Sequence, residues 1–171
     1  MKTLLRATAI SLAAILGLTP VSWAETLALP TQEVVLTVTG EIAHTNSGAS
    51  AQFDLGMLMD LDATIIETST IWTEGEQTFE GVALHVLLDA LGVEDGTLLA
   101  TAINDYTVEI PVSDAVEGGP IIAYMQNDET MSVRDKGPLW VVYPYDSSAI
   151  YRSEVVYSRS IWQLDRITII Q

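Results

Sequence analysis

Residues 82–92 are Val-Ala-Leu-His-Val-Leu-Leu-Asp-Ala-Leu-Gly, and this stretch decides the fold. Its leucines recur three or four positions apart, a spacing that gathers their side chains on one face of a helix. The leucines of this face are Leu84, Leu87, Leu88 and Leu91. Gly92 follows, and glycine commonly ends a helix because it adopts the left-handed backbone conformation without strain. The spacing predicts a helix over Val82–Leu91.

Short strand patterns and apolar runs lie on both sides of this helix. They are alternating, β-branched or continuously apolar, and glycine, proline or acidic turns separate them. These segments are Glu33–Thr39, Ala63–Trp72, Leu98–Ile103, Tyr106–Ile110, Pro120–Met125, Leu139–Tyr143 and Leu164–Ile170. Two short helical segments are also expected, one capped by Asp54 and one capped by Ser113. This arrangement predicts a β-rich α+β fold, a single domain built on mixed sheet.

Residues 1–24 have the three parts of a secretory signal peptide. Lys2 and Arg6 supply the charged start, residues 7–18 form an apolar run, and small residues precede the expected cleavage site. We expect a mature domain at residues 25–171 and a periplasmic or secreted location. An uncleaved membrane anchor is the alternative, although the apolar run is short for a membrane span.

The chain is strongly acidic. It has 23 Asp and Glu residues against 7 Lys and Arg residues, a formal net charge of −16. Nucleic acid and anionic membrane surfaces would repel the exported domain, so we expect neither as a partner. Residues 7–133 contain no Lys or Arg, and every later basic residue lies between Arg134 and Arg166. A site for an anion is therefore expected near the C-terminal end, with scattered ion pairs as the alternative.

Common catalytic signatures are missing from the sequence. There is no G-x-S-x-G, H-E-x-x-H, phosphate-binding loop or dinucleotide fingerprint. There is also no cysteine, which removes thiolate chemistry and thiolate metal ligands. The sequence therefore assigns no catalytic residue and no metal ligand.

Five short segments instead occur in a fixed order. They are FEGVAL at 79–84, NDYTVEIP at 104–111, IIAYM at 121–125, GPLWVVYP at 137–144 and YSRSIWQL at 157–164. This succession resembles the molybdopterin-binding domain of the sulfite-oxidase family. In that family W-x-G-V-P-L leads into a leucine-rich helix, and D-G-Y-x-x-x-I-P, L-A-Y-x-M, G-x-P-L-R-L-V-V-P and K-S-x-K-x-L follow. The resemblance spans residues 34–170 and implies the family's mixed α+β fold.

The resemblance also implies a binding site for molybdopterin, the one cofactor that it suggests. In the family, polar and basic groups hold the pterin phosphate, and Ser158, Arg159 and Ser160 fall in the place of the closing motif. Arginine and hydroxyl donors suit a phosphate. The further candidate cofactor-binding residues are Asn104, Tyr106, Arg134 and Lys136.

Two positions depart from the family pattern. The family binds molybdenum through a cysteine shortly before the motif glycine, and the corresponding position here lies near Ser69. A serine hydroxyl is a much poorer ligand than a thiolate for a soft, redox-active metal. The second departure is Trp140, which occupies the place of the arginine in P-L-R. Both departures argue against sulfite-oxidase chemistry.

Three functions follow, and the first is favoured. It is an exported, non-catalytic relative that binds a small anionic ligand or a pterin as an accessory or sensory protein. The second is a molybdopterin-dependent oxidoreductase whose metal has a non-cysteine ligand. The third is a protein-interaction domain without a small ligand, in which an exported partner protein contacts aromatic residues such as Trp72, Tyr145 and Tyr151.

Overall fold

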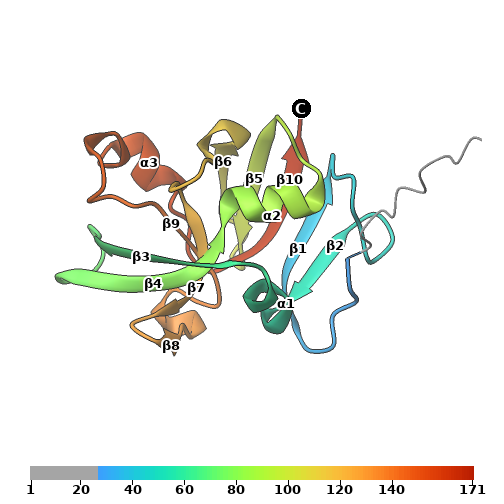
Figure 1. Ribbon diagram of the computed structural model, residues 1–171, viewed down its shortest axis with the longest axis horizontal. Helices are drawn as coiled ribbons and strands as arrows, with labels where there is room; N and C mark the ends of the chain where they lie inside the picture. Colours follow the sequence, from blue (N-terminus) through green and yellow to red (C-terminus); the bar gives the residue numbers. More distant parts are fainter. Residues whose placement is uncertain (1–26) are drawn as a thin grey trace, which may run out of the picture.

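The computed structural model describes residues 27–171, which form a mixed α+β single domain, as the sequence predicts. Its strands form two sheets. The predicted signal peptide at residues 1–24 lies outside the described residues. No helix within residues 27–171 is long and apolar enough to cross a bilayer. Figure 1 shows helix α2 (Leu84–Leu91) lying over one sheet, and a long hairpin of β3 (Ala63–Ser69) and β4 (Glu76–Ala83) that extends away from it.

The first sheet has five strands in the order β2-β1-β10-β5-β6. The strands are β1 Val34–Gly40, β2 Ala51–Asp54, β5 Thr97–Ala102, β6 Thr107–Pro111 and β10 Leu164–Ile170. β1 and β10 are parallel, with Thr37 opposite Arg166, whereas the other neighbours are antiparallel. The end of the chain therefore lies in the middle of this sheet, next to the strand that begins the described domain.

The second sheet is antiparallel and follows the order β3-β4-β7-β8. β9 pairs with residues 121–123 of β7, on the edge of β7 away from β4. The strands are β3 Ala63–Ser69, β4 Glu76–Ala83, β7 Ile121–Gln126, β8 Glu129–Thr130 and β9 Trp140–Val142. β9 also contacts the segment after the last helix, because the Val141 N–H donates to the Ile161 carbonyl at 2.8 Å. The C-terminal segment thus connects the two sheets.

Three α-helices and three short 3₁₀ turns complete the domain. They are α1 Leu55–Asp60, α2 Leu84–Leu91, α3 Glu154–Arg159, η1 Val112–Asp114, η2 Val133–Asp135 and η3 Ala149–Tyr151. As predicted, Asp54 caps α1, with its side chain accepting from the Met57 N–H at 2.9 Å. Gly92 ends α2 in the left-handed conformation, with a φ of 69°.

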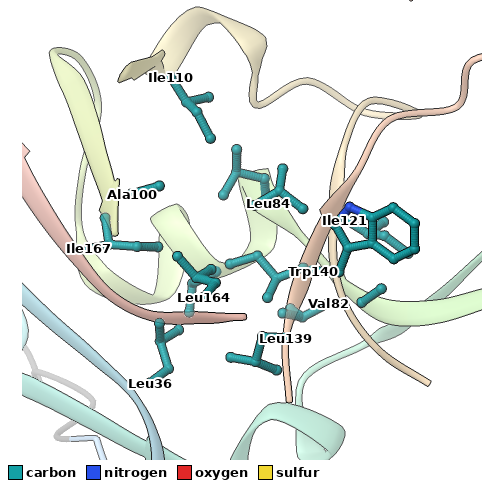
Figure 2. Packing of buried hydrophobic residues seen from close by; sticks show 14 of the residues in the cluster. Leu36, Val82, Leu84, Ala100, Ile110, Ile121, Leu139, Trp140, Leu164 and Ile167 are labelled. Carbon is teal, nitrogen blue, oxygen red and sulfur yellow. The ribbon is translucent and has the colours of Figure 1, made fainter. Parts of the chain in front are cut away.

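The core joins both sheets to α2. All four leucines of the predicted face are buried in it. Figure 2 shows side chains from β1, β5, β6 and β10 meeting side chains from β4, β7 and β9, with Leu84 of α2 among them. The leucine face of α2, predicted from the spacing, therefore packs in the core between the two sheets.

Most segment boundaries are close to those expected from the sequence, and β10 coincides with its predicted range. α2 begins at Leu84 rather than Val82, because β4 continues through Ala83, whose backbone is extended. β3 ends at Ser69 rather than Trp72, because a turn follows. β2, β4 and α3 were not predicted.

Gly81 allows β4 to lie closely against β7. A Cβ at this position would meet the Ile122 carbonyl oxygen and would lie 2.6 Å from the Ala123 Cα, both backbone atoms of β7. We expect Gly81→Ala to lower the free energy of unfolding by about 2 kcal/mol or more, since a strand backbone cannot move aside locally. Urea denaturation followed by circular dichroism measures the change.

The matched control is Gly56→Ala in α1. Its added Cβ would lie 3.3 Å from the nearest atom, Asp54 Oδ1, and alanine favours a helix over glycine. The expected change is below about 1 kcal/mol in either direction. Equal losses for the two variants would contradict the close contact between β4 and β7.

Candidate functional site

A pocket of about 290 Å³ lies between the β5–β6 loop, the turn after β3 and the segment after α3. We call it the aromatic pocket. Its lining residues are Trp72, Ala102, Asn104, Tyr106, Tyr157, Ser158, Ser160, Ile161, Trp162 and Gln163. Four of the seven residues predicted to bind a cofactor are among them, namely Asn104, Tyr106, Ser158 and Ser160.

The β5–β6 loop forms one wall of the pocket. It turns at Asp105, whose φ is 66°, and the Asn104 side-chain oxygen accepts from the Tyr106 N–H at 3.2 Å. This local hydrogen bond presents the Tyr106 ring at the surface, where it is 58% exposed. The predicted Asn-Asp-Tyr motif is therefore a turn that positions an aromatic ring.

Trp72 forms the centre of the opposite wall. Its ring meets those of Trp162, Tyr157 and Trp140 edge to face, at centroid distances of 5.6, 5.8 and 5.9 Å. Edge-to-face contacts at these distances are favourable. The Thr70 hydroxyl oxygen accepts from the Trp72 N–H at 3.0 Å and fixes the turn that carries the ring.

The serines of the closing segment are committed to internal hydrogen bonds. Ser160 is buried, and its hydroxyl accepts from the Tyr145 hydroxyl at 2.6 Å and donates to the Val156 carbonyl at 2.9 Å. Burial raises the pKa of Tyr145 to about 12, which keeps this phenol a donor. The Ser158 hydroxyl donates to the Val155 carbonyl at 2.7 Å. These serines line the pocket but already use their hydroxyl protons.

Arg159 does not line the aromatic pocket. Its Nη1 donates to Asp114 Oδ2 at 2.9 Å, and the Tyr143 hydroxyl donates to the same oxygen at 2.7 Å. Burial and the hydrogen bond to Asp114 raise the pKa of Tyr143 well above its usual range. The predicted phosphate-binding arginine is thus paired with a carboxylate, and it lines a neighbouring cavity that shares Tyr106 and Ser158 with the aromatic pocket.

The other predicted basic residues also lie outside the pocket lining. Lys136 Nζ lies 5.4 Å from the centre of the Trp140 ring, a cation–π contact behind the aromatic walls. Arg134 lies in η2 and is exposed. The structure therefore does not bring Arg134, Lys136 and Arg159 together around one anion.

Ser69, at the position of the family's cysteine, ends β3 and contacts Asp146. Its hydroxyl donates to Asp146 Oδ2 at 2.8 Å, and its N–H donates to the same oxygen at 2.6 Å. The Asp146 N–H donates in turn to the Thr68 hydroxyl at 3.1 Å. Donation from Ser69, first from its N–H and then from its hydroxyl, holds the pKa of Asp146 below its usual range.

Six lining residues were not assigned to a ligand site from the sequence, namely Trp72, Ala102, Tyr157, Ile161, Trp162 and Gln163. No local pattern identifies them, because Trp72 and Tyr157 lie 85 positions apart. Trp162 and Tyr157 belong to the closing segment, so that segment indicated the right region of the chain. Of the aromatic residues named for a protein contact, Tyr145 is buried in the core.

The family model for the oxidoreductase molybdopterin binding domain matches residues 19–149. The mixed α+β fold and the order of its motifs agree with this match, and the chain belongs to this family. The matched range includes Asn104, Tyr106, Arg134 and Lys136, and it ends before Ser158. Among curated proteins, none matches this chain in sequence.

The residues of the pocket do not fit the family's metal-bearing cofactor. The Ser69 hydroxyl, nearest the family's thiolate position, lies outside the pocket lining and already donates to the Asp146 carboxylate. No Lys or Arg belongs to the pocket lining, although such charged donors form the strongest hydrogen bonds to a phosphate. Within residues 27–171 no three His, Asp or Glu side chains gather as a metal site.

We expect Arg159→Ala to lower the free energy of unfolding by about 1–2 kcal/mol, because it removes a charged donor from the partly buried Asp114. Thermal and urea denaturation measure the loss. The matched control is Arg152→Ala: Arg152 lies 4.0 Å from Asp146, both side chains are well exposed, and the change should stay within about 0.5 kcal/mol. Equal effects of the two variants would show that the Arg159 pair is no stronger than a surface pair.

The Ser69–Asp146 contact should make stability depend on pH. A carboxylate whose pKa is lowered on folding contributes stability above its unfolded pKa, and this contribution is lost as the pH falls through the folded pKa. The melting temperature of Asp146→Asn should therefore lie below that of the wild type at pH 7, and the difference should shrink below about pH 4. A constant difference from pH 7 to pH 3 would contradict this assignment.

Proposed function

We propose that this chain is an exported, non-catalytic member of the oxidoreductase molybdopterin-binding domain family. In this proposal it acts as an accessory or sensory protein and binds a small ligand in the aromatic pocket. The observation that supports it most is that the residues at the family's cofactor-binding positions form hydrogen bonds within this chain. Ser69 is bonded to Asp146 and Arg159 is bonded to Asp114, whereas the cavity is lined by aromatic rings and by no Lys or Arg.

The geometry favours a ligand that packs on aromatic faces over a free anion. An anion binds best to a basic group, and the pocket lining has no Lys or Arg, while the hydroxyl protons of Ser158 and Ser160 are used internally. A pterin ring without its metal is one ligand with suitable faces. The alternative of an oxidoreductase requires a metal ligand at Ser69, and its hydroxyl would first have to leave Asp146.

The test uses the protein purified in its natural form from its own host. Mass spectrometry of the intact chain should give a mature start at residue 25, and elemental analysis should find no molybdenum. Native mass spectrometry at low collision energy should show a retained or added small ligand that leaves on denaturation. Molybdenum at close to one atom per chain would contradict the proposal, and a chain that keeps residues 1–24 would contradict export by cleavage.

A variant separates ligand binding from folding. We expect Trp162→Leu to weaken ligand retention about tenfold, because Trp162 is 38% exposed and gives a large aromatic face to the pocket. Its melting temperature, measured in parallel, shows whether the fold persists. Full retention of the ligand in a folded Trp162→Leu protein would place the binding site elsewhere.

A further inference from the structure

Aromatic rings surround the pocket on several sides. Trp72, Tyr157 and Trp162 come from two distant segments, and Tyr106 faces them from the β5–β6 loop. The faces of aromatic rings carry negative electrostatic potential, strongest for tryptophan, and they attract cations. Outside the pocket lining, Trp140 packs against Trp72 and Trp162 and already contacts one cation, because Lys136 Nζ lies over its ring at 5.4 Å.

The charges around the pocket also favour a cation. None of the lining residues is Lys or Arg, so no side chain of the wall repels a positive group. Arg166 lies nearby in sequence, but it pairs with Asp105 at the tip of the loop and with Asp165 at 3.0 Å. The whole chain carries a formal charge of −16, which raises the local concentration of cations.

The absence of carboxylates from the pocket lining restricts the kind of cation. Calcium and magnesium require several oxygen ligands, and the pocket wall has no Asp or Glu. A methylated ammonium group instead spreads its charge over methyl groups that pack against rings, as in the aromatic sites that bind choline. The volume of about 290 Å³ suits a small molecule, since ligand pockets start at about 300 Å³.

We propose that the aromatic pocket binds a small organic cation with a quaternary ammonium group. This inference rests on the proposed function, because it names the ligand class of the same pocket. The ammonium group lies against the tryptophan and tyrosine faces. Asn104 and Gln163 at the rim contact the polar remainder of the ligand.

The experiment is isothermal titration calorimetry of the full mature chain with choline chloride, in buffer of matched ionic strength. The neutral isostere 3,3-dimethylbutan-1-ol has the same shape without the charge. We expect saturable binding of choline and at least tenfold weaker binding of the isostere. Equal affinity for both compounds would overturn the proposal, because the pocket would then recognise shape alone.

Substitutions locate the binding site. Tyr106→Leu should weaken choline binding about tenfold, whereas Tyr106→Phe, which keeps the aromatic face, should stay within about twofold. Tyr106 is 58% exposed, so neither change should disturb the fold. Tyr151→Leu is the matched control, because Tyr151 lines a different cavity beside Arg159, and it should leave binding unchanged. An equal loss in Tyr106→Phe and Tyr106→Leu, or a loss in Tyr151→Leu, would overturn the assignment.

Two further probes separate this inference from the proposed function. Binding of biopterin or inorganic phosphate without binding of choline would overturn the cation assignment and leave a ligand-binding protein. Binding of none of the four compounds would overturn the cation assignment, whereas the proposed function would still be decided by the natively purified protein. Molybdenum in that protein would overturn the proposed function whatever the calorimetry shows.

Discussion

The complete burial of Trp140 is the constraint on which the pocket depends. Its ring has no exposed surface, meets Phe79 at a centroid distance of 5.2 Å, and donates its Nε1–H to the Ser160 carbonyl at 3.2 Å. A large indole whose donor is satisfied in this way stabilises the contact between β9 and the C-terminal segment. It also supports Trp72 and Trp162 from behind. The family resemblance places an arginine at this position, so Trp140 stands in place of a cation and supports the aromatic residues that line the pocket.

At two other positions of the family pattern, groups expected to bind the cofactor contact residues of this chain instead. Arg159 and Ser69 stand where the resemblance expects groups for a phosphate and a metal, but each is bonded to a carboxylate of this chain. Such bonds stabilise the domain and remove those donors from a ligand. This chain has the mixed α+β fold of the family match, while these polar groups serve internal contacts, since a fold does not by itself determine the chemistry of a site.

Local patterns predicted the elements that their own residues determine. The leucine spacing of α2, the Asp54 cap of α1 and the alternation of β10 are such patterns, and all three elements are present. β4 was not predicted, since its first half is polar and it is held by pairing with β3 and β7 on both sides. Only part of the site was predicted, because local patterns reveal local turns and do not reveal contacts between distant residues. Asn104 and Tyr106 form a local turn that the motif indicates, whereas the partner of Arg159 lies 45 positions away.

Ligand recognition in the proposed site uses exposed aromatic rings and not the basic residues of the C-terminal segment. The most direct measurement is a ¹H–¹⁵N spectrum of the indole N–H groups during titration with choline. The signals of Trp72 and Trp162 should move in a saturable way, whereas that of Trp140 should move little, because its N–H is bonded to Ser160 inside the core. Stationary tryptophan signals, with shifts confined to the arginine side chains on addition of phosphate, would contradict the claim.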